Sequence, residues 1–278
     1  MMDPIEAHAA RLPATGEGWI PRSHPREVLA SALLEGPAGV VVHPLDNVKD
    51  HIRKLLAGDP DKWFGMSGLG GLTDRQVLEL TGAAAGFVPD HEASTGPVEV
   101  DPTLVLDRCE AIGVRLGQAC ARGERVILAT GHPVGMILLY METARLLASR
   151  GAKLLRPADG LEWREGDRHH HWQVRYLNDV GILTDKASAR HTHAPEPMER
   201  MLEEARPDLV FADHGFAGAA IEAGVETVSI ADVNDPALIV AKALGRTEHV
   251  VVMDDNVQPD AYWPCFQAIA SGVVGLSG

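Results

Sequence analysis

The sequence is poor in the residues that mark several classes of protein. Its 278 residues include three cysteines in no Cys-x-x-Cys pair, so we expect reduced thiols in a cytoplasmic protein. Aromatic residues make up only 5%, so aliphatic and alanine side chains must fill the core. No apolar run approaches the roughly 18 residues of a membrane span, and the N-terminus holds no apolar signal region.

Positive charge is also scarce. Lysine and arginine together number 25 against 39 aspartates and glutamates, a formal net charge of −14. Surfaces that bind nucleic acid are usually basic, so this balance argues against such a partner. The composition therefore indicates a protein with neither a nucleic-acid nor a membrane partner, and it is compatible with a homo-oligomer.

One stretch has a regular alternation of elements. Val126–Ala129 is an apolar run that suits one buried strand, and residues 130–135 (TGHPVG) follow as a turn. Met136–Ser149 has a helical pattern, and Lys153–Arg156 begins a second strand. This strand-turn-helix-strand unit predicts an α/β fold, with a mostly parallel Rossmann-like sheet and helices on both faces.

The rest of the chain divides around this unit. Residues 1–122 are expected to form a mainly helical N-terminal region that covers the site, and residues 123–278 a Rossmann-like α/β region. The two regions are also compatible with one integrated domain. The alternation is interrupted between Pro157 and Leu183, where LEWREG and HHHWQVRYL predict a hairpin around Gly166-Asp167 and a flap.

Acidic residues recur where apolar strands end. In a parallel sheet these ends lie at one edge, where several carboxylates would repel one another unless a cation neutralised them. Carboxylate and amide oxygens suit Mg²⁺ or Mn²⁺, and histidine is more compatible with Mn²⁺. The predicted metal ligands are Asp213, Asp232, Asn234, Asp254, Asp255 and Asn256. The same pattern at Asp46-Asn47 has no assigned role.

A simpler interpretation competes with the metal site. An aspartate after a strand is often just the N-cap of the next helix. Asp235 before Pro236 fits this interpretation, as does Asp185 before Lys186.

The TGHPVG turn is the candidate phosphate site. Amides at a helix N-terminus attract phosphate, so Thr130, Gly131, His132 and Gly135 are predicted to hold phosphoryl oxygens. His132 or His214 would act as acid or base beside Asp213. A tight turn with an exposed histidine remains the alternative, and the turn lacks the G-x-G-x-x-G spacing of dinucleotide folds.

Other polar clusters are weaker candidates. Histidines on successive strand positions point to opposite faces, so His169–His171 is expected to be a solvated hairpin. His191 and His193 could face one way but precede Pro195 and are interpreted as loop. Asp90 and His91 lie in a surface loop that could close over the site, and their role stays open.

Four strings carry a family resemblance. They are ATGHPVG (129–135), ADHGFAGAAIEAG (212–224), ADVNDPAL (231–238) and MDDNVQP (253–259). With them the chain resembles a family of actinobacterial proteins labelled "phosphatase", most strongly from Arg125 to Phe266. The resemblance implies metal-assisted hydrolysis of a phosphate ester and brings no assigned catalytic residues. Asp254-Asp255-Asn256 does not have the D-x-D spacing that other phosphatases carry at a strand end.

These observations favour a metal-dependent phosphatase that hydrolyses a small phosphorylated metabolite, by attack of a metal-bound water on phosphorus. Two alternatives remain open at this point. One is a nucleotide-dependent oxidoreductase or transferase, and the other is a non-catalytic protein that binds an anionic metabolite.

Overall fold

The computed structural model describes residues 23–164 and 171–275. Its helices are α2 (Arg26–Leu33), α3 (Leu45–Leu56), α4 (Pro60–Trp63), α5 (Asp74–Ala85), α6 (Pro102–Arg122), α7 (Ile137–Ser149), α8 (Glu196–Glu204), α9 (His214–Glu222), α10 (Ala237–Ala243) and α11 (Trp263–Gly275), with a 3₁₀ turn at Pro259–Tyr262. Its strands are β1 (Gly39–Val40), β2 (Glu99–Val100), β3 (Arg125–Ala129), β4 (Lys153–Leu154), β5 (Glu162–Arg164), β6 (His171–Leu177), β7 (Val180–Thr184), β8 (Ala189–Arg190), β9 (Leu209–Asp213), β10 (Thr227–Ala231) and β11 (His249–Val252).

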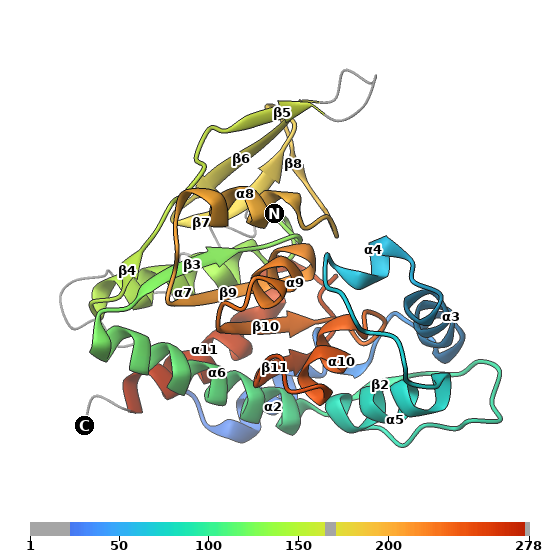
Figure 1. Cartoon of the computed structure of the whole chain (residues 1–278). Coiled ribbons are helices and arrows are strands. Elements are labelled where there is room, and N and C mark those ends of the chain that lie inside the picture. Colours follow the sequence, from blue (N-terminus) through green and yellow to red (C-terminus); the bar gives the residue numbers. More distant parts are fainter. Residues whose placement is uncertain (1–22, 165–170, 276–278) are drawn as a thin grey trace.

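A central sheet organises the molecule (Figure 1). Its strand order is β11-β10-β9-β3-β7-β6-β5, with β4 beside β3 and β8 beside β7. The strands from β11 to β7 are parallel, and β6 and β5 continue the sheet in antiparallel orientation. The predicted α/β fold with a mostly parallel sheet is therefore confirmed.

The hairpin expected between Pro157 and Leu183 is present as β5 and β6, and it extends one edge of the sheet. Its turn at Gly166-Asp167 lies outside the described residues, as do His169 and His170.

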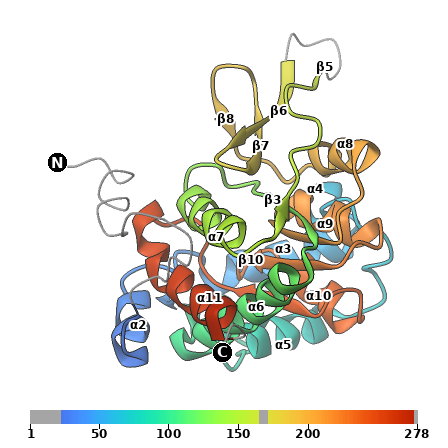
Figure 2. The same cartoon turned by 90° about the vertical axis from the view of Figure 1, so that its left-hand side faces the viewer.

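Helices cover the parallel part of the sheet. Figure 2 shows α6, α7 and α11 on one side of it and α9 on the other. Every residue of β9 and of β10 is buried. Strands covered on both faces carry continuous apolar runs rather than alternation, which explains LVFA at residues 209–212.

Local signals set the ends of α5 and α6. Asp101 caps α6 by accepting hydrogen bonds from the amides of Thr103 and Leu104, and Gly123 ends the helix in the left-handed region. Thr73 caps α5 in a capping box with Gln76.

The helix after β9 follows the strand without a loop. It begins at His214, directly after the strand, because His214 adopts a φ of 45° and turns the chain at once. This left-handed backbone places a histidine at the strand–helix junction.

The segments before β3 contact the ends of β10 and β11. The amide of Asp254 donates to the carbonyl of Pro37 at 2.9 Å, and the amide of Val42 donates to the Asp254 carboxylate at 3.1 Å. Among the described residues, no helix is both long and apolar enough to cross a bilayer.

Candidate functional site

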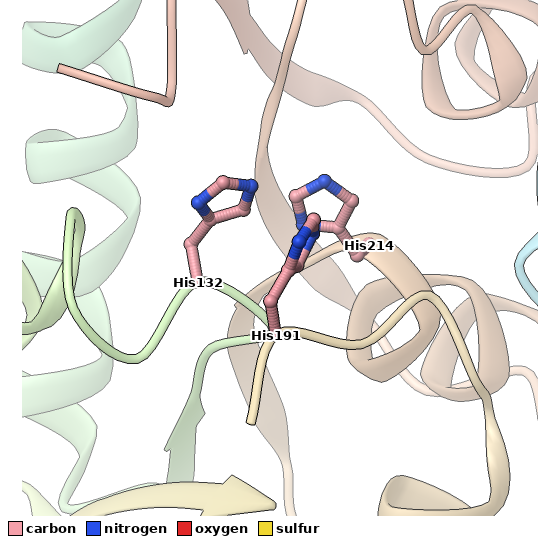
Figure 3. A group of neighbouring side chains, drawn as sticks. All are labelled: His132, His191 and His214. Carbon is pink, nitrogen blue, oxygen red and sulfur yellow. The ribbon is translucent and has the colours of Figure 1, made fainter. Parts of the chain in front are cut away.

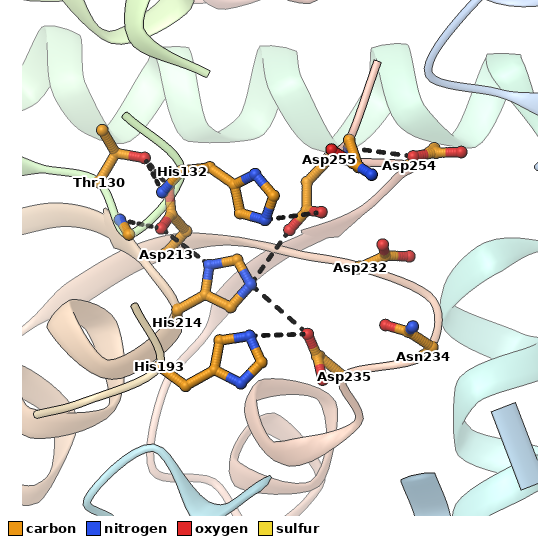
Figure 4. Close-up of polar contacts among 12 residues, drawn as sticks. Thr130, His132, His193, Asp213, His214, Asp232, Asn234, Asp235, Asp254 and Asp255 are labelled. Atoms are coloured by element: carbon orange, nitrogen blue, oxygen red, sulfur yellow. Dashed lines mark hydrogen bonds and ion pairs between the residues drawn. The ribbon is translucent and has the colours of Figure 1, made fainter. Parts of the chain in front are cut away.

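The carboxyl ends of four parallel strands meet at one edge of the sheet. Each strand is followed by polar residues, and the loop after β8 and the segments around α3 and α4 add more. Figure 4 shows that many of these side chains converge. The polar residues at this edge are Thr130–His132 after β3, Asp213-His214 at β9, Asp232–Asp235 after β10, Asp254–Asn256 after β11, His191 and His193 after β8, and His43, His51 and Lys62 from the N-terminal part.

Asp213 is completely buried and fully hydrogen-bonded. Its carboxylate accepts from the hydroxyl of Thr130 at 2.6 Å, the amide of Gly131 at 2.6 Å and Nδ1 of His214 at 3.0 Å. Burial alone would raise the pKa of Asp213, but the hydrogen bonds from His214 and Thr130 hold it below its ordinary value. Asp213 therefore fixes the β3 turn and the orientation of the His214 ring.

His214 presents its other ring nitrogen to two carboxylates. Its Nε2 lies 3.4 Å from Oδ2 of Asp235 and 3.4 Å from Oδ2 of Asp255. Burial would lower the pKa of His214, but Asp255, Asp213 and Asp235 outweigh it and raise that pKa well above the usual value. The surroundings of Nε2 thus favour a positive charge.

Asp235 joins several elements at this point. Its carboxylate lies 3.0 Å from Nζ of the buried Lys62, 3.6 Å from His51 and 4.0 Å from His193. Burial opposes ionisation, but hydrogen bonds from His214 and His51 hold the pKa of Asp235 well below its ordinary value. The helix-cap interpretation of Asp235 was wrong: α10 starts after Pro236 without a side-chain cap, and Asp235 faces the site instead.

Four histidine rings lie together. The ring centroids of His132 and His191 are 4.1 Å apart, and those of His132 and His193 each lie 4.8 Å from that of His214. Figure 3 shows His132, His191 and His214 approaching from three different segments. Burial first, and then the charge of His214, lowers the pKa of His132 to about 3 and that of His191 to about 4. Both rings are therefore neutral near pH 7 and offer nitrogen lone pairs.

Two sets of donor atoms have the spacing of a metal site. His132, His191 and His214 form one set and His193, His214 and Asp235 the other, with each set's ligand atoms within 4.8 Å of one another. Oδ1 of Asp232 is buried without a hydrogen-bond partner, and Oδ2 of Asp255 is buried with only its 3.4 Å ion pair to Nε2 of His214. Buried carboxylate oxygens normally have a partner, so these two leave acceptor capacity for a cation.

Two close backbone contacts hold the loop that carries His191 and His193. The amide of Thr192 donates to the carbonyl of Gly131 at 3.0 Å. A Cβ at Gly131 would lie 2.4 Å from the carbonyl oxygen of Thr192, and a Cβ at Gly215 would lie 2.2 Å from that of His193. Glycine at both turns is what lets this loop bring its histidines to the strand ends.

The remaining predicted metal ligands lie beside the histidines with partners of their own. Oδ2 of Asp232 is 3.1 Å from Nε2 of His43, and the Asn234 amide donates to Asn47 at 2.9 Å. The carboxylate of Asp254 accepts from the backbone amides of Val42 and Asn256 at 3.1 and 3.0 Å. Asp254 thus resembles a loop-stabilising residue, whereas Asp232 keeps one oxygen without a partner.

The predicted phosphate cradle is partly occupied by the protein itself. The amide of Thr130 donates to the carbonyl of Gly181 at 3.0 Å, and that of Gly131 donates to Asp213. Gly135 and His132 line an open cavity. A ligand can therefore reach the turn at His132 and Gly135, but not at the amides of Thr130 and Gly131.

The residues left open by the sequence have local contacts. Asp46 accepts from the hydroxyl of Thr95, and Asp90 accepts from the amides of Glu92 and Ala93. His91 is paired with Glu79. These contacts stabilise loops.

Comparison with known proteins identifies the family. A family model described as "Phosphatase" matches residues 23–274. The chain belongs to the phosphatase family. Phosphatase SCO2771 from Streptomyces coelicolor is 37% identical to it over 265 residues, which are 92% of this chain and 99% of the relative. The resemblance seen in the sequence is confirmed, and this phosphatase is a phosphoric ester hydrolase.

Sequence reasoning missed several residues of this phosphatase's cluster. His51 and Lys62 lie in α3 and α4, where no strand-end pattern marks them. His43 follows β1, close to the Asp46-Asn47 pattern, and was not predicted. His191 and His193 carried a usable signal, because histidines two apart in an extended loop can face the same way.

Proposed function

We propose that this histidine–aspartate cluster binds a divalent cation and hydrolyses a phosphomonoester of a small metabolite. The observation that carries the proposal is the convergence on His214 of two donor sets whose ligand atoms lie within 4.8 Å. Membership in the phosphatase family favours hydrolysis over the nucleotide-dependent and non-catalytic alternatives.

The donor chemistry narrows the choice of cation. Three imidazoles, or two imidazoles and a carboxylate, suit Mn²⁺ or Zn²⁺ better than Mg²⁺, which prefers oxygen ligands. Of the two metals expected from the sequence, we therefore favour Mn²⁺. We assign His132, His191 and His214 as its ligands, with Asp255 beside them.

The bound cation would polarise a phosphoryl oxygen and neutralise charge that develops on it. The chain supplies orientation and proton transfer. Asp213 holds the His214 ring through Nδ1, which leaves Nε2 facing the site. His193 is held at Nδ1 by Asp61 at 3.0 Å. Its Nε2 faces the site, 4.0 Å from Asp235, and is the atom that would hold or move a proton. We therefore assign the acid–base role to His193 instead of the sequence-predicted His132 or His214.

Metal content and activity can be measured on matched variants. His191→Ala should lose the tightly bound metal found by mass spectrometry after dialysis, and with it hydrolysis of an aryl phosphate. His193→Ala should keep the metal, lose about 100-fold or more in kcat, and regain activity with added imidazole. His91→Ala, in a loop outside the cluster, is the control and should behave like wild type.

Removal of the metal gives the second arm of this test. Dialysis against EDTA should abolish turnover, and Mn²⁺ should restore it. Full activity in EDTA together with no bound metal in the wild-type protein would falsify the metal assignment.

A further inference from the structure

A cavity of about 710 Å³ opens beside the histidine cluster. Its wall includes His132 and His191, two of the proposed metal ligands. The TGHPVG turn lines one part of it, residues 256–261 line another, and Glu35, just after α2, adds to the rim. An ester whose phosphate lies at the histidines would place the rest of the molecule in this cavity.

The wall of this cavity has a distinct chemistry. Among its described lining residues, Glu35 is the only acidic side chain, and none is lysine, arginine, phenylalanine, tyrosine or tryptophan. Pro133, Val134, Val257 and Ala261 give apolar surface, and Val134 is 68% exposed. The polar side chains of Asn256 and Gln258 can hydrogen-bond to a hydroxyl.

A second cavity, which also includes His191 in its wall, is smaller and has a different lining. It measures about 220 Å³ and is lined by Arg164, Arg200, Trp163 and Trp172. His132 is not part of its described lining, so it meets only one of the three proposed ligands. The larger cavity is therefore the better position for the alcohol part of a substrate.

We infer that the larger cavity binds the leaving group and selects phosphomonoesters of small aliphatic alcohols that carry no second anionic group. This inference rests on the proposed function of the cluster. A carboxylate or second phosphate here would face Glu35, with no lysine or arginine among the described lining residues to offset the repulsion. A nucleobase would find no phenylalanine, tyrosine or tryptophan ring among the described lining residues to stack on.

The reaction balances without a further reactant. The oxygen of water bonds to phosphorus, and the bond between phosphorus and the alcohol oxygen breaks. One proton passes to that oxygen, so the products are inorganic phosphate and the free alcohol.

Two probes of nearly equal size test the charge selection. Glycerol 3-phosphate and 3-phosphoglycerate differ mainly in a hydroxymethyl group against a carboxylate. Each is measured for kcat/KM and for competitive inhibition of aryl phosphate hydrolysis by the metal-loaded enzyme. We expect the wild type to favour glycerol 3-phosphate at least tenfold. Glu35→Lys should reduce this ratio about threefold to tenfold, because reversing a nearby charge weakens the repulsion.

A matched substitution separates a local effect from a change of net charge. Glu248 is 89% exposed and lies just before β11, at the opposite end of that strand from Asp254. Glu248→Lys should leave the ratio unchanged. Equal or better use of 3-phosphoglycerate, no binding of either probe, or a ratio insensitive to Glu35→Lys would each overturn the inference while aryl phosphate hydrolysis persists. Loss of all ester hydrolysis by the metal-loaded enzyme would instead refute the proposed function, and the inference with it.

Discussion

At the scale of single residues, the position and orientation of His214 are fixed by several features at once. It has a left-handed backbone, it is buried, and both of its ring nitrogens face carboxylates. Unfavourable backbone conformations of this kind persist only where the surrounding contacts hold them. The contacts that hold His214 come mainly from Asp213, whose carboxylate also fixes the turn that carries His132.

Substitution of Asp213 should therefore damage the site more than the fold. Asp213→Ala removes the acceptor of Nδ1 and frees the His214 ring, so kcat should fall by about 100-fold or more. The measurement is steady-state kinetics with an aryl phosphate, beside circular dichroism to show that folding is retained. Asp185→Ala, which removes a turn contact to Ser188 outside the site, should change kcat by less than about twofold. A folded and fully active Asp213→Ala protein would contradict the role given to Asp213.

At the scale of elements, the loop of residues 191–194 completes the site. It lies against the β3 turn and the start of α9, and glycine at both positions permits that contact. The histidines of this loop depend on backbone packing as much as on their own chemistry.

Gly215→Ala tests this dependence. The added methyl group would lie 2.2 Å from the carbonyl oxygens of His193 and Ala194, so the loop must move away from α9. We expect a loss of about 2 kcal/mol or more in unfolding free energy, together with weaker binding of Mn²⁺. Urea unfolding and calorimetric titration measure the two effects. Gly70→Ala has no atom within 4 Å of the added carbon and serves as the control. Unchanged Mn²⁺ affinity in Gly215→Ala would show that the loop is not needed for the site.

The elements also show what a sequence can predict. Asp101 and Gly123 mark the ends of α6, and the apolar runs mark β3, β9 and β10, because these signals are local. The gathering of Asp213, Asp232 and Asp255 at one edge also follows from parallel topology.

Neighbouring residues in the sequence do not determine which role each of these aspartates has. Asp213 and Asp254 hold backbone groups while Asp235 meets Lys62, 173 positions away in the chain. No spacing rule connects residues so far apart.

At the scale of the whole molecule, the two ends of the parallel strands have different roles: ion pairs lie where the strands begin, and the candidate site lies where they end. The buried Arg115 of α6 bonds to Glu226 at 2.6 Å and to Glu124 at 2.8 Å, just before β10 and β3 begin. The histidines lie where those strands end. We therefore expect stability and catalysis to be separable by substitution.

Arg115→Ala should lower the unfolding free energy by about 2–3 kcal/mol, below the value for a fully buried pair because the Glu226 side chain is 52% exposed. Well below the melting temperature, kcat should be unchanged. The hydrogen bond from Arg115 lowers the pKa of Glu226, so this stabilisation is present above the unfolded-state pKa of about 4.3 and is lost as pH falls below it. Thermal unfolding from pH 7 to pH 3 should show a smaller decline in Arg115→Ala than in wild type. Parallel declines would mean that the ion pair adds nothing.

The proposed ligands lie at positions 132, 191 and 214, with Asp255 beside them, so each comes from a different strand-end segment. No single strand-end segment carries them all, so on this assignment the metal site forms only when these segments have folded together. The enzyme would then hydrolyse no phosphate ester before the sheet is assembled, and proteolytic cleavage or local unfolding between these segments would abolish its activity.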